Sequence, residues 1–333
     1  MKIKFHLIFL ITKRALSDIK FGTKSGYPFR NLQNSPIQNI INQSTEIHTV
    51  FRHGTRNPTP SNMKMFEKHY PDYPYKWKLK DEKSLVEAGK LEHRRFGRIL
   101  KKFASPQAVF ISSSHQRSID SAKAFYQGAD ADFWDITSIN DAQMRYYDNC
   151  PKHVRDLENK DSEGETKKRE YVDLIGEKNF AKYLICGYEL AIFDKSEMCD
   201  EVQDFSEYSD IKTFYRSGFG GNEQAYLPSS VVVESVLDSI EKEVSSFRFG
   251  HTETVLPMLA LLDLVDVEIG QKYWDSTSLG PFAANIWFLI DRTNDKAWIS
   301  VNEKVVRKFA TIISFKEFLT NATVKTGVEI SRF

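Results

Sequence analysis

The first half of the chain alternates short apolar runs with longer amphipathic stretches. Residues 46–51 (EIHTVF) alternate in the manner of a strand, and residues 108–111 (AVFI) read as a second, buried strand. Apolar residues recur at helical spacing over 83–103, and a further helical stretch covers 118–126. The order strand, helix, strand, helix predicts a parallel sheet covered by helices, which is an α/β fold.

The last third of the chain continues this mixture. Residues 231–244 carry one apolar helical face, and a short strand is predicted over 247–249. Residues 254–265 are apolar nearly all round, which predicts a buried helix with Pro257 near its first turn. Two more strands, joined by a polar loop, predict a hairpin over residues 283–291 and 297–301.

A highly charged segment separates these two regions. Eleven of the sixteen residues 155–170 are charged. Such a run suits an exposed loop or a solvated helix inside an inserted segment, and a plain linker fits it equally well.

Composition narrows the class of protein. The 333 residues are enough for one large domain or two ordinary ones, and 41% hydrophobic with 27% charged residues is typical of a folded, soluble chain. A net charge of +1 gives no global basic field, so we expect no nucleic-acid partner and only a local anion site. No apolar run reaches the length of a membrane-spanning helix. The three cysteines match neither a disulfide scaffold nor a zinc pattern.

The amino terminus bears on the compartment. Residues 1–17 have a basic start and a short apolar run, which resembles a secretory signal; a plain strand is the alternative. Glycosylation sequons at Asn42 and Asn321 fit a secretory route, although such triplets also arise by chance. The chain ends at Phe333 without a KDEL-type retention signal.

The residues that follow the first predicted strand are suited to phosphate chemistry. Arg52 and Arg56 flank His53 where α/β sheets place their ligand sites. Two guanidinium groups can clamp phosphate oxygens, and a neutral imidazole held beside them can attack phosphorus and form a phosphohistidine. The alternative is a surface loop with ordinary basic residues.

A second group of candidates lies farther along the chain. His251 and Glu253 stand where a strand passes into a helix, so the histidine can bind phosphate and the carboxylate can act as general acid and base. Arg117 also follows a predicted strand. Taken separately, these residues could equally be a core histidine, a helix-capping carboxylate and a surface arginine.

The segment Arg52–Pro58 (RHGTRNP) resembles the RHGxRxP signature of the histidine acid phosphatases, the second branch of the histidine phosphatase superfamily. The form RHGTRxPT is typical of the multiple inositol polyphosphate phosphatases within that family. Similarity to the family extends over most of the chain, through residues 21–25, 112–125, 148–151, 186–199, 247–262, 281–285 and 302–304.

This resemblance implies an architecture. The expected fold is a histidine-phosphatase-like core, with a mainly parallel sheet flanked by helices, plus a smaller and mainly helical inserted domain. On this basis we expect a split catalytic core in residues 45–139 and 226–320, and an insert in residues 140–225 that is short for the family.

The resemblance also implies roles for the candidate residues. His53 is similar in position to the family's nucleophile and Glu253 to its proton donor, although Thr252 replaces the alanine of the family's HAE motif. The implied phosphate-binding residues are Arg52, Arg56, Arg117 and His251. No metal and no cofactor is expected, because the arginines supply the charge stabilisation.

The expected substrate is a small phosphorylated molecule, in particular an inositol polyphosphate of the phytate type. Lys64, Lys76 and Lys78 follow the nucleophile loop and are candidates for contacts with additional phosphates, although a solvated face explains them as well. Two other hypotheses are a general acid phosphatase acting on other phosphomonoesters, and a catalytically impaired paralogue that binds phosphorylated ligands. The sequence does not determine the oligomeric state.

The resemblance also bears on the cysteines. Cys186 and Cys199 match two family cysteines and are expected to form a disulfide, which would leave Cys150 free or paired between chains. A secreted protein or one in the lumen of the secretory pathway would follow. Three reduced thiols in a cytosolic protein are the alternative.

Overall fold

The computed structural model describes residues 19–75, 77–103, 105–131, 135–149, 163–200, 202, 205, 210, 213–214, 216–218, 223–265 and 275–324. The predicted signal segment 1–17, Lys76 and Cys150 lie outside these residues. Among the described helices, none combines the length and the apolar character needed to cross a bilayer.

A central sheet organises the fold, with strand order β3-β2-β4-β1-β5-β6-β7. Its strands are β1 (Glu46–Arg52), β2 (Val109–Ser112), β3 (Ser138–Ile139), β4 (Ser246–Gly250), β5 (Asn285–Asp291), β6 (Lys296–Val301) and β7 (Lys304–Phe309).

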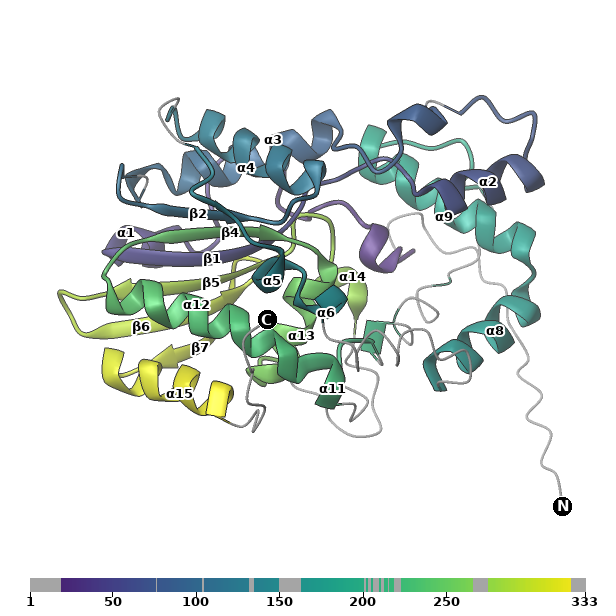
Figure 1. The fold of residues 1–333 in the computed structure, drawn as a ribbon. Coiled ribbons are helices and arrows are strands. Elements are labelled where there is room, and N and C mark those ends of the chain that lie inside the picture. The colour runs from purple at the N-terminus through teal and green to yellow at the C-terminus, as the bar shows by residue number, and fades with distance from the viewer. Residues whose placement is uncertain are drawn as a thin grey trace, which may run out of the picture.

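Helices lie on both faces of this sheet (Figure 1), with α3 and α4 on one face and α12 and α15 on the other. The helices are α1 (Gln38–Gln43), α2 (Pro60–His69), α3 (Glu87–Ile99), α4 (Gln116–Gly128), α5 (Asp141–Met144), α6 (Tyr146–Asn149), α8 (Glu163–Ile175), α9 (Glu177–Phe193), α11 (Glu223–Tyr226), α12 (Ser230–Glu241), α13 (Thr252–Leu261), α14 (Ser276–Leu279) and α15 (Ile312–Val324). Short 3-10 helices are η2 (Gly22–Lys24), η3 (Leu79–Asp81), η4 (Lys101–Phe103) and η5 (Leu227–Ser229).

The α/β fold and the strands expected from the sequence are confirmed, but the sheet is mixed rather than mainly parallel. β3, β2, β4 and β1 pair in parallel, whereas β5, β6 and β7 join β1 through antiparallel pairs. The β5–β6 hairpin accounts for part of this arrangement, because a tight turn can connect only antiparallel strands. The β6–β7 turn is shorter still, with only Asn302 and Glu303 between the strands, at the positive φ values of 47° and 60° that a two-residue hairpin requires.

The central strands contribute side chains to two apolar cores, one on each face of the sheet. In β5, Ile286, Phe288 and Ile290 join the core beneath α12 and α13, while Trp287 and Leu289 join the one beneath α3 and α4. Successive side chains of a strand point to opposite faces, so a strand covered on both faces is apolar throughout. All seven residues of β5 are buried.

Two predicted helices differ in detail. The helical pattern over 83–103 becomes α3, which starts only at Glu87, because the backbone turns at Lys83 (φ 52°) and Leu85 pairs with Arg56 as an isolated β-bridge. The buried helix α13 starts at Thr252, and Pro257 lies inside it rather than near its first turn. Apolar periodicity predicts which face of a helix is buried, but it does not predict the residue at which the helix begins or ends.

The region 140–225 is helical wherever an element is described. α8 covers the second half of the charged run, and the residues of that run before 163 lie outside the described part of the chain. α9 packs against α2 and α3, while α5 packs against α12 and β4. The division into a split core and an inserted domain remains a prediction.

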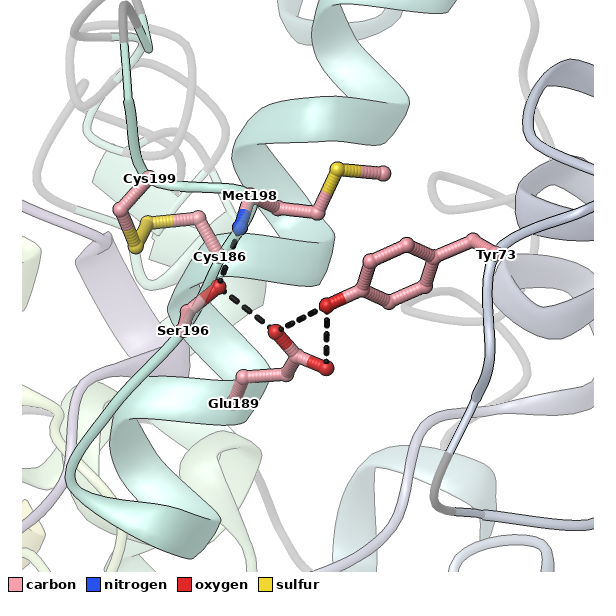
Figure 2. Close-up of a disulfide and its surroundings, with 6 residues drawn as sticks. All are labelled: Tyr73, Cys186, Glu189, Ser196, Met198 and Cys199. Carbon is pink, nitrogen blue, oxygen red and sulfur yellow. Dashed lines mark hydrogen bonds between the residues drawn. A yellow bond between two sulfur atoms is a disulfide. The ribbon is translucent and has the colours of Figure 1, made fainter.

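The predicted disulfide between Cys186 and Cys199 is present, with Cα atoms 5.0 Å apart. Figure 2 shows the buried Glu189 beside it, one turn along α9. The Glu189 carboxylate accepts hydrogen bonds from the Tyr73 hydroxyl at 2.8 Å and from the Ser196 hydroxyl at 2.6 Å. The disulfide and the bond from Ser196 hold the segment after α9 against that helix, and the bond from Tyr73 holds the segment after α2 against it. Asn42 and Asn321 are exposed, on α1 and α15.

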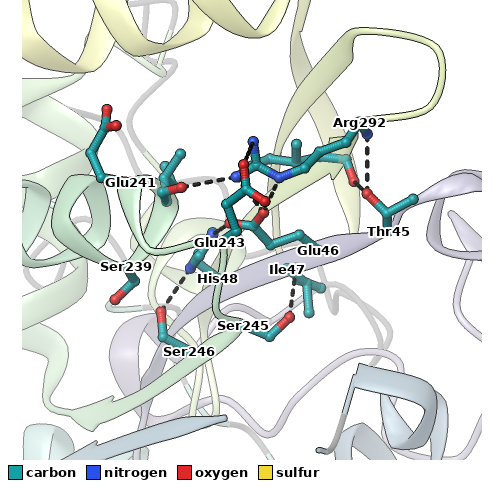
Figure 3. A network of polar contacts seen from close by, with 12 residues as sticks. Thr45, Glu46, Ile47, His48, Ser239, Glu241, Glu243, Ser245, Ser246 and Arg292 are labelled. Carbon is teal, nitrogen blue, oxygen red and sulfur yellow. Dashed lines mark hydrogen bonds and ion pairs between the residues drawn. The ribbon is translucent and has the colours of Figure 1, made fainter. Parts of the chain in front are cut away.

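A buried polar network lies at the start of β1 (Figure 3). Glu46 accepts from Arg292 Nε at 2.6 Å and lies 2.6 Å from His48 Nε2. Because a carboxylate only accepts, His48 donates from Nε2, and its Nδ1 accepts from the Ser246 hydroxyl at 2.8 Å. The network joins β1, β4 and the β5–β6 turn. It therefore helps to fix the register in which β1 and β4 pair along their whole length.

Candidate active site

The loops after β1 and β4 lie side by side. The His53 N–H donates to Gly250 O at 2.9 Å, and His53 O accepts from the Ala283 N–H at 3.1 Å. Gly250 ends β4 and pairs with Arg52 at the end of β1. The carboxyl ends of parallel neighbours share one edge of a sheet, so the two histidine motifs meet there despite their distance in sequence.

Contacts with α3 hold the loop after β1. Gly54 lies so close to this helix that a Cβ atom would stand 2.5 Å from Gly89 O, which leaves room only for glycine. The N–H and the hydroxyl of Thr55 each donate to the buried Glu92 carboxylate at 2.8 Å. The backbone on both sides of Gly54 is therefore constrained.

His53 is held in one tautomer. Its Nδ1 lies 2.9 Å from Gly54 O, and because a carbonyl only accepts, Nδ1 carries the proton. Burial, followed by the charges of Arg52 and Arg117, places the pKa of His53 well below its usual range. The ring is thus neutral, with the lone pair of Nε2 available for attack.

Arg52 is anchored at one nitrogen. Its Nη1 donates to Thr23 O at 2.8 Å and to Gly280 O at 2.7 Å. The guanidinium carbon stacks 4.4 Å from the centre of the Phe282 ring, a cation–π contact. Burial, together with the neighbouring Arg56, lowers the pKa of Arg52 to about 9, so the group remains charged at neutral pH.

The three arginines have one property in common. Among the described residues, Nε of Arg52, Arg56 and Arg117 is buried and has no hydrogen-bond partner. Burying unpaired guanidinium donors is unfavourable, and paired donors of this kind match the oxygens of a phosphate. The arrangement is therefore suited to an oxyanion.

His251 completes this group. Its ring centre lies 5.5 Å from that of His53. Arg117 Nη2 lies 3.1 Å from Nδ1, and since arginine only donates, Nδ1 accepts and Nε2 donates to the Ser113 hydroxyl at 2.9 Å. A serine hydroxyl both donates and accepts, so Ser113 can also support the tautomer in which Nδ1 donates to a bound phosphate. His251 has hydrogen-bond partners, as a core histidine would, and yet borders the arginine cluster.

Glu253 lies in the first turn of α13 and its side chain is exposed. The surrounding protein disfavours its charged form, but a hydrogen bond from its own backbone N–H and the charges of Arg216, Arg52 and Lys24 outweigh this effect and lower its pKa. The carboxylate is therefore ionised at neutral pH in the free protein. Its influence on the pKa values of Arg52 and Arg117 places it next to the arginine cluster.

The lysine candidates are not tied to this site. Lys64 and Lys78 are exposed, and within the described residues the side chain of neither forms an ion pair or a hydrogen bond. Lys76 lies outside the described part of the chain. Their contact with substrate stays a prediction, as do the chemical roles of the clustered residues.

Sequence reasoning did not assign a role to several residues of the site. Phe282 stacks on Arg52, Ser113 binds His251, and His115 lies 5.0 Å from the His251 ring centre. His115 and Phe282 lie in segments that resemble the histidine acid phosphatases, and this resemblance was the only feature of the sequence that could have pointed to them. Residue spacing alone does not indicate a stacking partner. In the described part of the chain, no group of three or more histidine, cysteine or acidic side chains is arranged to hold a metal ion.

The chain is similar in sequence to known phosphatases. Residues 45–173 match the model of the histidine phosphatase superfamily (branch 2). The multiple inositol polyphosphate phosphatase 1 of Gallus gallus is 24% identical over an aligned length of 327 residues. The alignment covers 75% of this chain and 72% of that protein.

Solved structures show the same fold. The phytase from D. castellii superposes with a TM-score of 0.66 at 13% identity, covering 85% of this chain and 81% of the other. The multiple inositol polyphosphate phosphatase of Bifidobacterium longum gives a TM-score of 0.59 at 13% identity, covering 87% and 93%.

Proposed function

We propose that the chain is a histidine acid phosphatase, in branch 2 of the histidine phosphatase superfamily, and that it hydrolyses inositol polyphosphates through a phosphohistidine intermediate. The observation that carries this proposal is a set of three guanidinium nitrogens, unpartnered among the described residues, around a histidine whose Nε2 lone pair is available. The names of the relatives support the inositol polyphosphate as substrate class.

In the first step, the phosphate binds Arg52, Arg56, Arg117 and His251. Nε2 of His53 attacks phosphorus and the bond to the ester oxygen breaks. The proton that the substrate monoanion brings passes through the Glu253 carboxyl group to that oxygen. The arginines stabilise the charge on the phosphoryl oxygens throughout.

In the second step, water replaces the departed alcohol. The Glu253 carboxylate accepts a proton from this water as its oxygen attacks phosphorus. The P–N bond breaks, its electron pair returns to His53, and inorganic phosphate leaves. No step needs a metal ion, because the three guanidinium groups carry the positive charge.

We further propose that the protein works in the secretory pathway or outside the cell. The disulfide between Cys186 and Cys199 supports this location, because such bonds persist in oxidising compartments.

Substrate choice provides the direct test. We expect the purified protein to release phosphate from inositol hexakisphosphate with a higher kcat/KM than from 4-nitrophenyl phosphate, before and after dialysis against EDTA. Phosphate release and nitrophenol absorbance measure the two reactions. Faster turnover of the aryl ester would indicate a general acid phosphatase, dependence on a metal would contradict the mechanism, and absence of turnover on both esters would contradict the enzyme proposal.

The pH dependence follows from the ionisation of the site. Because the pKa of Glu253 is lowered, the proton for the leaving oxygen arrives with the substrate monoanion, which loses it near about pH 6. His53 stays neutral under mildly acidic conditions because its pKa is depressed.

We therefore expect kcat/KM to persist at about pH 5 and to fall roughly tenfold per pH unit above about pH 7. Glu253→Gln should lower the rate with inositol hexakisphosphate by roughly 10²–10⁴-fold. A pH–rate profile of the wild type from pH 4 to 8 checks the first prediction, and a kcat/KM that rises steadily from about pH 6 to 8 would contradict it. The rate of Glu253→Gln at about pH 5, compared with that of the wild type, checks the second.

A further inference from the structure

A proline changes the hydrogen bonding of the helix that carries Glu253. In a regular helix, the N–H of residue 257 would donate to the carbonyl of Glu253, four residues earlier. Pro257 lies inside α13 and has no N–H, and a proline ring also displaces the carbonyl that faces it. The main chain of Glu253 therefore lacks its ordinary partner within the helix.

Tyr146 supplies the missing donor. Its hydroxyl donates to Glu253 O at 2.8 Å, from the start of α6. Tyr146 is only 4% exposed. Burial and, to a smaller extent, the Glu253 charge raise its pKa well above the usual value, so the hydroxyl keeps its proton over any working pH range.

A second bond joins the same two segments. The Thr254 hydroxyl donates to Met144 O at 2.7 Å and accepts from the His251 N–H at 2.9 Å. The segment that contains Met144 and Tyr146 is thus bonded to two consecutive residues of α13, Glu253 and Thr254. Both bonds lie in the first turn of the helix, where the carboxylate is placed.

We propose that Tyr146 is a positioning residue for the proton donor: its hydroxyl replaces the helical hydrogen bond that Pro257 removes and so orients Glu253 toward the ester oxygen. This inference rests on the proposed function, in which Glu253 protonates the leaving group. It adds a group that touches neither the substrate nor the reacting atoms.

Loss of the Tyr146 hydroxyl should depend on the leaving group. An inositol alkoxide is a poor leaving group and needs the proton from Glu253, whereas 4-nitrophenolate leaves without it. For Tyr146→Phe, we expect kcat to fall about tenfold with inositol hexakisphosphate and less than about twofold with 4-nitrophenyl phosphate, with KM little changed. A merely structural defect would slow both substrates equally.

The helix itself offers a rescue. In the double variant Tyr146→Phe with Pro257→Ala, the new backbone N–H of residue 257 can donate to Glu253 O. We expect the ratio of the two rates to return toward the wild-type value. This variant also tests the inference if Tyr146→Phe alone is unstable, because the bond is then made within α13.

Tyr126→Phe is the matched control, since it removes another tyrosine hydroxyl, on α4 and against Phe110 rather than Glu253. It should leave the ratio of the two rates unchanged. A wild type without phosphate release would overturn the proposed function and this inference together. An active wild type would overturn this inference alone if Tyr146→Phe slowed both substrates equally, or if a folded double variant kept the altered ratio.

Discussion

His53→Ala should abolish phosphate release from inositol hexakisphosphate, with a loss of at least about a thousandfold. The substitution removes the only atom that the mechanism uses to accept the phosphoryl group. The clamp residues remain, so the variant should still bind inorganic phosphate.

The same experiment can detect the intermediate. Wild-type protein quenched in alkali during turnover should carry a phosphoryl group on the peptide that contains His53, as mass spectrometry would show, and the variant should not. His69→Ala is a suitable control because His69 lies on α2 and pairs with Glu177, away from the arginine cluster. A His53→Ala protein that is folded and retains wild-type turnover would refute the phosphohistidine mechanism.

Arg95→Met should destabilise the fold strongly. Arg95 is 1% exposed and its two terminal nitrogens lie 2.5 and 2.9 Å from the two carboxylate oxygens of Glu303, which is fully buried. The Tyr27 hydroxyl also donates to Glu303 at 2.8 Å. Removing the arginine leaves a buried carboxylate without its cation, which costs about 3–5 kcal/mol of unfolding free energy.

Thermal unfolding provides the measurement. We expect the melting temperature of Arg95→Met to fall by roughly 4–7 °C. The double variant Arg95→Met with Glu303→Gln should recover part of this loss, because no charge is then buried. Lys101→Met, which breaks the exposed ion pair with Asp130, is the control and should change the melting temperature little. An Arg95→Met protein as stable as this control would contradict the assigned role of the pair.

The elements that depend on local pattern can be predicted from the amino-acid sequence. The strand before Arg52, the helices α3, α4 and α12 and the β5–β6 hairpin are all recognisable, because their periodicity and turn residues are local properties of the chain. The candidates His53, Arg52 and Arg56 were found for the same reason, since they are adjacent in one segment.

Properties that depend on residues distant in sequence became visible only in the folded chain. The sheet is mixed because β5 pairs antiparallel to β1. The helix α3 begins later than the apolar pattern predicts, because the backbone turns at Lys83. Local periodicity does not specify which strands pair or in which direction.

The chemistry of the site was decided in the same way. The tautomer of His251 depends on Arg117 and Ser113, and the depressed pKa of His53 depends on burial and on cations from several elements. Tyr146 binds the carbonyl that Pro257 leaves without a partner, 107 residues along the chain. A residue pattern supplies the groups capable of phosphate chemistry, whereas their protonation and orientation arise from charges and hydrogen bonds that only folding brings within reach.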